Sequence, residues 1–150
     1  MEKIAMAKED YVELAHLLHA VDFFAPLTIG QLEKILPYIF LCRAKSGETV
    51  FRQGDPGDAF YILKQGRVSV RLRRLMIFSS KVAALKAGDF FGEMALLSRD
   101  RRNASVVCEE DCRFFVLLAA DFQSVLKQNP SFAREMAKTA ENRRFMSQHA

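Results

Sequence analysis

Apolar residues near the start of the chain recur with the period of an α-helix. Tyr11, Leu14, Ala15, Leu18 and Val21 are spaced so that all five fall on one face of a helix. We therefore expect an amphipathic first helix whose apolar face, Tyr11 included, is turned toward the core.

A second helix is expected to begin just after Thr28. Thr28 is a favourable N-cap, and Gln31, three residues later, completes the pattern of a capping box. Leu27 and Leu32 occupy the two positions of a hydrophobic staple around that cap. These signals place a pair of N-terminal helices within residues 8–37.

The pattern changes after residue 37, where short apolar runs alternate with turn residues. Turn signals about 8 to 12 residues apart are typical of an all-β sandwich or barrel. In Asp55-Pro56-Gly57-Asp58, the order of Pro and Gly predicts a type II turn with a positive φ at Gly57. The apolar runs between the turns are the expected strands: 40–44, 49–52, 59–64, 68–73, 82–85, 105–108 and 113–118.

Residues 119–147 are expected to be helical again. Asn129 and Pro130 divide this stretch, because they fit the cap and the first position of a new helix. One side of that last helix carries an apolar line that ends in an arginine: Phe132, Met136, Ala140 and Arg143. These patterns together predict a mainly β fold with flanking helices, as one domain over residues 1–150 with its β region over 38–118.

The composition fits a globular chain with a substantial core, since half of the residues are hydrophobic and thirteen are Phe. The formal net charge is +4, which is mild for a nucleic-acid binder. Arg71, Arg73 and Arg74 alternate with Val70 and Leu72, as on the solvated face of a strand. No apolar run approaches the roughly 20 residues that span a bilayer. We therefore expect no nucleic-acid partner and no insertion of this chain into a membrane.

The three cysteines are Cys42, Cys108 and Cys112. Their odd number, and the lack of a signal-peptide pattern, predict reduced thiols and a cytoplasmic location, including the cytoplasmic face of a membrane receptor. Cys108 and Cys112 flank an acidic turn, but the histidines lie far away in sequence, so we expect no metal site. We also expect no enzyme and no catalytic residue, because no His falls in the β region.

Residues 91–106 interrupt the expected strands with residue types that suit an anion. Gly92 allows the backbone to approach a ligand closely, because it has no Cβ. The N–H groups from Glu93 to Ala95 would begin a short helix, and we expect them to be free to bind an anion. Arg102 follows after a loop long enough to fold back. Its planar guanidinium could donate two hydrogen bonds to two phosphate oxygens.

Glu93 would be out of place beside a bare phosphate. A carboxylate fits there if the ligand also presents a hydroxyl donor, as a sugar does. An anion, a neighbouring hydroxyl and an apolar cradle together describe a nucleotide. The alternatives are a helix-capping role for Glu93 and a surface position for Arg102 in a polar loop.

The stretches Phe91-Gly92-Glu93-Met94-Ala95-Leu96 and Arg102-Asn103-Ala104-Ser105 resemble the phosphate-binding cassette of the cyclic-nucleotide-binding domain family. The resemblance extends from about residue 10 to residue 146, and glycines 47, 54, 57, 66 and 88 fall where the family's β-roll turns. Asn103 departs from the pattern, which has Ala, Ser or Thr at that position. In the family a Thr there accompanies a preference for cGMP, so Asn103 leaves the choice of base open.

The resemblance implies an antiparallel β-roll, a jelly-roll-like double-stranded β-helix, with an N-terminal helical pair and C-terminal hinge and lid helices. It also implies the residues that contact the phosphate and ribose: Phe91, Gly92, Glu93, Met94, Ala95, Arg102, Asn103 and Ala104. Val70 and Ala83 would line the base pocket, with core packing as the alternative. Arg143 would stack over the base from the lid helix, or else serve as a cation near a helix C-terminus.

The function implied is a regulatory domain that binds cAMP, in preference to cGMP, without a further cofactor, and moves its C-terminal helices in response. The C-terminal stretch is similar to the sensor domain of a prokaryotic cyclic-nucleotide-regulated potassium channel, so the expected partner is a channel pore or another effector outside this chain. The alternative is a stand-alone sensor or adaptor that acts on a separate protein. Residues up to Ala150 show no helix-turn-helix after the lid, so we do not expect direct DNA binding.

Overall fold

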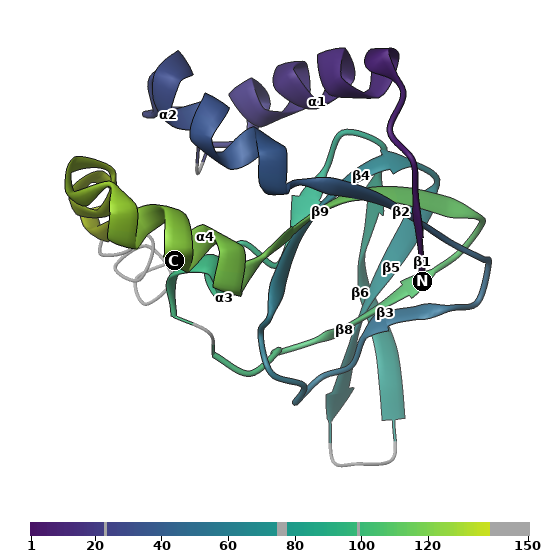
Figure 1. Cartoon of the computed structure of the whole chain (residues 1–150). Helices are drawn as coiled ribbons and strands as arrows, with labels where there is room; N and C mark the ends of the chain where they lie inside the picture. The colour runs from purple at the N-terminus through teal and green to yellow at the C-terminus, as the bar shows by residue number, and fades with distance from the viewer. Residues whose placement is uncertain (23, 75–77, 99, 139–150) are drawn as a thin grey trace.

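The computed structural model describes residues 1–22, 24–74, 78–98 and 100–138. Figure 1 shows a β-roll with helices against one side of it, and a long hairpin that extends away from those helices. The strands form two antiparallel sheets: one of five strands in the order β1-β2-β9-β4-β7, and one of four in the order β3-β8-β5-β6. The predicted fold class, mainly β with flanking helices, is confirmed.

The elements have these bounds in chain order: β1 Glu2–Ile4, α1 Lys8–Ala20, α2 Ile29–Ile35, the short 3-10 helix η1 Leu36–Tyr38, β2 Phe40–Ala44, β3 Thr49–Phe51, β4 Ala59–Gln65, β5 Arg67–Arg74, β6 Phe78–Lys86, β7 Phe90–Phe91, α3 Met94–Leu97, β8 Ser105–Cys108, β9 Cys112–Leu118 and α4 Ala119–Gln128. Residues 130–138 are helical as well.

The N-terminal helices form for the reasons read from the sequence, with one correction. The capping box is present, because Gln31 N–H donates to Thr28 Oγ1 and Thr28 N–H donates to Gln31 Oε1. Leu14 and Leu18 of α1 are fully buried. Tyr11, however, is 52% exposed. The prediction that its side chain faces the core is wrong, and the buried face of α1 starts one turn later.

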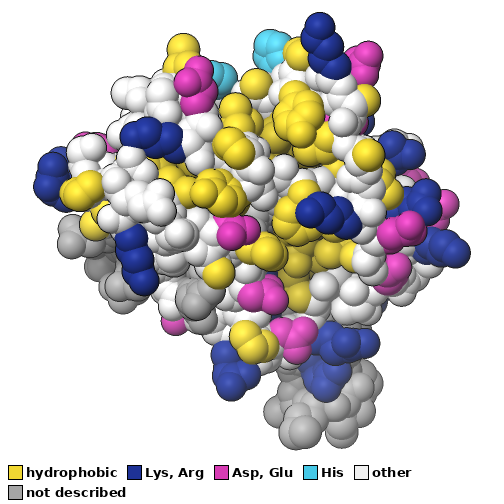
Figure 2. All heavy atoms as spheres, in the orientation of Figure 1, with side chains coloured by type: hydrophobic (Ala, Val, Ile, Leu, Met, Phe, Trp, Pro, Cys, Tyr) yellow, Lys and Arg dark blue, Asp and Glu magenta, His cyan; other side chains and the backbone are white. Residues whose placement is uncertain are grey.

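The five-stranded sheet has a hydrophobic cluster on each face. On its outer face, Phe60, Ile62 and Phe115 pack against the helices and contribute to the larger cluster. On its inner face, Tyr61 and Phe114 pack inside the roll together with residues of the second sheet. Alternate residues of β4 therefore serve opposite cores, which is why this strand is apolar almost throughout. Figure 2 shows hydrophobic side chains gathered where the helices meet the roll.

Three strands differ from the sequence-based expectation. β6 was expected over 82–85 but runs over Phe78–Lys86, paired along its length with β5. β1 and β7 were not expected at all, and each is short. β1 is polar and joins the edge of the sheet at β2, so no apolar run marked it.

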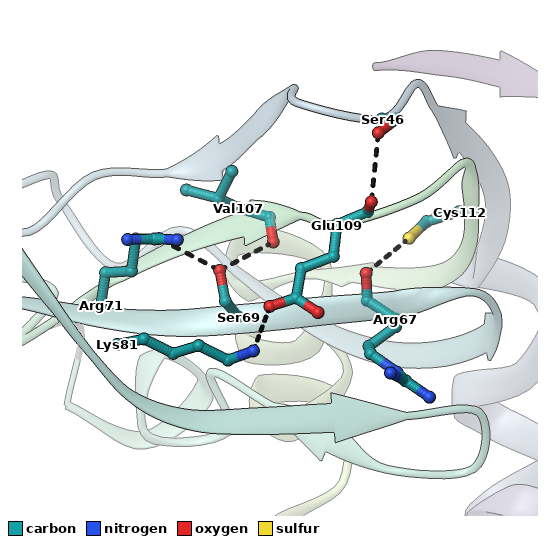
Figure 3. A network of polar contacts seen from close by, with 8 residues as sticks. All are labelled: Ser46, Arg67, Ser69, Arg71, Lys81, Val107, Glu109 and Cys112. Atoms are coloured by element: carbon teal, nitrogen blue, oxygen red, sulfur yellow. Dashed lines mark hydrogen bonds and ion pairs between the residues drawn. The ribbon is translucent and has the colours of Figure 1, made fainter.

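The outer face of the second sheet carries a polar network rather than a simply solvated row of arginines (Figure 3). Ser69 is fully buried, and its Oγ accepts a 3.2 Å hydrogen bond from Arg71 Nε. Lys81 on β6 and Glu109 after β8 form an ion pair of 2.5 Å. Arg71 is thus half-buried and hydrogen-bonded to Ser69, whereas Arg73 is exposed as expected. The side chain of Arg74 lies outside the described part of the structure.

The C-terminal region follows the expected division at Asn129 and Pro130. α4 covers 119–128, and the chain becomes helical again at Pro130. Asn129 occupies the cap position of the following helix, because its carbonyl accepts a 3.0 Å hydrogen bond from Ala133 N–H. Its side-chain Nδ2 donates to the carbonyl of Val125 at the end of α4. Within the described residues, no helix has the length and apolar character needed to cross a bilayer.

Candidate functional site

The predicted cassette lies at the end of the roll next to the helices. β7 pairs with β4 and ends at Phe91, Gly92 follows with a φ of 79°, and α3 begins at Met94. A left-handed backbone of this kind favours glycine. A Cβ on Gly92 would also lie 2.7 Å from Arg102 Nη1 and 3.1 Å from the carbonyl oxygen of Ala59, so a side chain here would displace the guanidinium. The fold therefore brings Gly92 and Arg102 together, as the sequence predicted.

Arg102 turns into the protein, and the alternative that it is a surface residue is wrong. It is only 8% exposed. Its Nη2 donates a 2.6 Å hydrogen bond to the carbonyl of Ala59, and its Nη1 lies 3.5 Å from the carbonyl of Gly92. The guanidinium carbon stands 4.0 Å from the centroid of the Phe51 ring.

The charge of Arg102 is only weakly compensated. The carboxylate of Asp58 lies 3.7 Å from Nη2, and its side chain is 74% exposed. Arg102 Nε is buried and has no hydrogen-bond partner among the described residues. Burial lowers the pKa of the guanidinium, while Tyr61, Asp58 and Asp55 act in the opposite direction. A buried cation with an unused N–H donor is the arrangement that an anionic ligand would complete.

The loop between β3 and β4, residues 52–58, is hydrogen-bonded to the cassette on both sides of Arg102. Arg102 N–H donates to the carbonyl of Asp55, and Gly54 N–H donates to the carbonyl of Arg102, both at 2.8 Å. Arg101 Nη1 also donates to the carbonyl of Gly54 at 2.8 Å. These bonds fix the backbone on both sides of the guanidinium.

Gly57 corrects a sequence-based expectation about this loop. A type II turn requires a positive φ at Gly57, but the glycine with that conformation is Gly54, at 91°. Gly57 is needed for a different reason: a Cβ there would lie 2.5 Å from the carbonyl oxygen of Asp100 and 3.2 Å from the Cβ of Ala95. The loop touches the cassette at a point where only glycine fits.

The start of α3 agrees with the expectation only in part. Ala95 N–H donates to the carbonyl of Gly92 at 3.2 Å, so the prediction that this N–H is free for an anion is wrong. The backbone closes a tight turn there before the helix continues. Glu93 is the N-cap residue of α3, but its carboxylate makes no capping hydrogen bond. The position of Glu93 at the N-terminus of α3 agrees with the alternative of an acid placed at a helix start, although no side-chain capping bond forms.

The other predicted contacts are distributed around this centre. Phe91 stacks on Tyr61 with ring centroids 5.1 Å apart, so its ring builds the wall of the roll. Met94 and Ala104 are half-buried, and Asn103 is exposed. Met94 lies close to Gly92 in sequence, and Asn103 and Ala104 directly follow Arg102, so all three lie beside these two residues.

The two residues expected in the base pocket are neighbours across the hairpin. Val70 of β5 pairs directly with Ala83 of β6. Val70 is half-buried against the inner cluster, while Ala83 is exposed. Arg143, the expected lid residue, lies outside the described residues.

Within the described residues, hydrogen bonds connect the site to α4. Gln123 Nε2 on α4 donates to the carbonyl of Leu96 on α3 at 2.6 Å. Ala119 N–H, at the start of α4, donates to the carbonyl of Asp58 at 2.8 Å. Asp58 therefore joins the environment of Arg102 to the first residue of α4.

The cysteines and a surface pocket lie apart from the cassette. Cys42, Cys108 and Cys112 are buried, and burial raises the pKa of Cys108 to about 12, so this thiol stays protonated. The described residues contain no cluster of metal-ligating side chains.

A pocket of about 570 Å³ opens near Arg43, Glu48 and Arg113, and it includes none of the predicted site residues.

The sequence did not indicate the residues of strands β3 and β4 that contact the guanidinium of Arg102. Phe51 and the carbonyl of Ala59 come from strands β3 and β4, which are far from the cassette in sequence. The clustering of Pro, Gly and Asp at 55–58 signalled a turn, but nothing in it signalled contact with Arg102. Only the pairing of the strands brings these groups together.

The sequence of the β-roll identifies the class of protein. Residues 41–129 match the profile described as "Cyclic nucleotide-binding domain". This segment is more than half of the chain, and the chain belongs to the cyclic nucleotide-binding domain family.

Particular relatives place the chain within this family. A cyclic nucleotide-gated potassium channel of Rhizobium etli is 33% identical over 137 residues, which cover 91% of this chain and 37% of the channel. A cGMP-dependent protein kinase of Toxoplasma gondii is 33% identical over 105 residues, 70% of this chain and 10% of the kinase. This chain thus spans little more than a third of the channel and a tenth of the kinase.

A solved structure supports the fold. The regulatory domain of Toxoplasma gondii PKA, crystallised with cAMP, superposes with a TM-score of 0.75 at 23% identity. The match covers 88% of this chain and 50% of the other. At this identity the likeness establishes the β-roll with its flanking helices.

Proposed function

We propose that this chain binds a cyclic nucleotide, cAMP in preference to cGMP, with Arg102 as the anchor of the cyclic phosphate. The observation that carries the proposal is the buried guanidinium beside Gly92, with an Nε that no described residue satisfies. Nε and Nη2 form the side-on edge of a guanidinium, which can donate two parallel hydrogen bonds to phosphate oxygens. A phosphate would also supply the negative charge that Asp58 provides only from 3.7 Å.

The remaining cassette residues would surround the sugar and phosphate. Glu93 would accept a hydrogen bond from a ribose hydroxyl. The other residues around the bound sugar and phosphate would be Phe91, Met94, Ala95, Asn103 and Ala104. Val70 and Ala83 would contact the base from the hairpin, where they stand directly opposite each other. Membership of the cyclic nucleotide-binding family supports these assignments as a group.

The output would be a movement of the C-terminal helices, without catalysis. The bonds from Gln123 to Leu96 and from Ala119 to Asp58 give the cassette direct contacts with α4. A cyclic nucleotide shifts this equilibrium only if it binds the two arrangements with different affinities. The moving helices would act on an effector outside this chain, and the similarity to a potassium channel makes a channel pore our first candidate.

A titration with four ligands tests this function: cAMP, cGMP, linear 5′-AMP and adenosine, each followed by calorimetry. We expect saturable binding with one site per chain, cAMP tightest, cGMP next, and the linear nucleotide and the nucleoside much weaker. Equal binding of adenosine and cAMP would contradict the phosphate anchor. Tighter binding of cGMP would overturn only the preference for cAMP.

A further inference from the structure

Arg102 lies against a wall of aromatic rings. Its guanidinium carbon is 4.0 Å from the centroid of Phe51, which ends strand β3. The Phe51 ring in turn lies 5.9 Å from the rings of Tyr61 and of Phe91. Tyr61 and Phe91 stack on each other at an interplanar angle of 11°. Phe51 therefore covers one face of the guanidinium, and Phe51 itself packs against the rings of Tyr61 and Phe91.

This contact adds to the polar contacts that orient Arg102. The bonds to Ala59 and Gly92 hold atoms in the plane of the guanidinium and come from backbone carbonyls. The Phe51 ring adds a contact over the guanidinium carbon. A desolvated cation over an aromatic face is attracted by the ring quadrupole, an interaction that an aliphatic side chain cannot provide.

The ring also affects how strongly the cation would attract an anion. Phe51 excludes water from one face of the guanidinium, and charge–charge attraction is stronger where water is excluded. A pre-oriented guanidinium loses less conformational freedom when it binds a phosphate.

Resting on the proposed function, we propose that Phe51 is a positioning residue for the ligand phosphate, which acts by holding the guanidinium of Arg102 with its aromatic face. It does not need to touch the ligand. The competing explanation is that Phe51 only fills space in the inner cluster, where it packs as a half-buried residue.

Two substitutions separate these explanations. Phe51→Leu keeps an apolar side chain in the cluster but removes the aromatic face, and Phe51→Tyr keeps the face. We expect Phe51→Leu to weaken cAMP binding about tenfold in calorimetric titration, in keeping with a desolvated cation–π contact. Phe51→Tyr should stay within about threefold of the wild type. Urea unfolding of each variant shows whether the fold is retained.

The Arg102 Nε–H resonance in a ¹H–¹⁵N spectrum provides a readout that space filling would not change. The signal is assigned by its loss in Arg102→Lys. In the free wild type and in Phe51→Tyr we expect it displaced by the ring current and protected from exchange with water. In Phe51→Leu it should move toward the position of exposed arginines and exchange faster.

A double-mutant comparison completes the test. In the Arg102→Gln background, the effect of Phe51→Leu on cAMP affinity should shrink to less than about threefold, because the cation is gone. An undiminished effect there, or a Phe51→Leu variant that binds cAMP as tightly as the wild type, would overturn the positioning role. A wild type that binds no cyclic nucleotide would instead overturn the proposed function itself, and the positioning role with it.

Discussion

Arg102 illustrates how a single residue can be unfavourable for the free protein and suited to a ligand. Its charge is removed from water, the largely exposed carboxylate of Asp58 lies 3.7 Å away, and its Nε has no hydrogen-bond partner within the part of the chain that the structure describes. Each of these features costs free energy of folding. Bound phosphate would provide the missing acceptor and the missing charge in one group.

Tyr61, which stacks on Phe91 near Arg102, makes the free energy of unfolding depend on pH. Burial, with a smaller contribution from Asp58, raises the pKa of Tyr61 to about 12 from an ordinary value of 10.0. The folded state therefore favours the neutral phenol. This contribution to the free energy of unfolding is fully present below pH 10 and is lost as the pH rises from about 10 to about 12. Its size is about 2 to 3 kcal/mol, at 1.36 kcal/mol per unit of pKa.

Tyr61→Phe is the matched control for this effect. Urea unfolding at several pH values between 9 and 12 should show the wild type losing more stability than the variant over that range. All other side chains are the same in both proteins, so the difference between the two curves reports on Tyr61. Parallel curves would contradict the burial of a neutral phenol at this site.

At the residue scale, sequence reasoning found what motif spacing can show. Gly92 and Arg102 were predicted to meet, and they do, so closely that a Cβ added to Gly92 would lie 2.7 Å from Arg102 Nη1. Phe51 was not found, because an apolar residue in a strand has the same appearance whether it packs on another apolar residue or on a cation. Ala95 was misread, since the turn at Gly92 uses its N–H internally.

At the scale of elements, the loop over residues 52–58 works as a support for the cassette. Gly57→Ala tests this support. Its φ lies outside the left-handed region, so the added methyl group acts through its contacts alone: 2.5 Å from the carbonyl of Asp100 and 3.2 Å from the Cβ of Ala95. We expect a loss of about 1 to 3 kcal/mol in the free energy of unfolding and weaker cAMP binding, because the cassette must move away.

Gly30→Ala, in α2, serves as the control for Gly57→Ala. The nearest atom to a Cβ at Gly30 is 3.9 Å away, and alanine favours a helix more than glycine does. Gly30→Ala should therefore leave cAMP affinity unchanged and should not lower stability. A Gly57→Ala protein as stable as the wild type, with unaltered affinity, would show that the loop does not support the cassette.

Elements were predictable where a local signal specifies them. The capping box at Thr28 and Gln31 formed as expected because both of its hydrogen bonds lie within one turn. The full length of β6 was not predicted, since Phe78–Lys86 owes its strand conformation to pairing with β5 rather than to its own alternation. β1 likewise depends on the edge of β2 for its hydrogen bonds.

At the scale of the whole molecule, the five-stranded sheet separates two cores with different tasks. The outer core joins the sheet to α1, α2 and α4, and the inner core contains Phe91 and Tyr61, next to Arg102. Asp58 and Gln123 link the two sides through the start and the first turns of α4. The sequence predicted a roll that is preceded and followed by helices along the chain. The strand order, which separates the two cores, depends on pairing between strands far apart in sequence, and no local pattern indicates it.

The central claim is that the guanidinium of Arg102 binds the cyclic phosphate. Calorimetric titration of the wild type and of Arg102→Ala with cAMP tests it most directly, with urea unfolding of both proteins to confirm that each is folded. The account predicts saturable binding by the wild type and a loss of about 2 to 5 kcal/mol in Arg102→Ala, the usual result of removing one partner of a desolvated charge pair. A folded Arg102→Ala protein that binds cAMP as tightly as the wild type would contradict it.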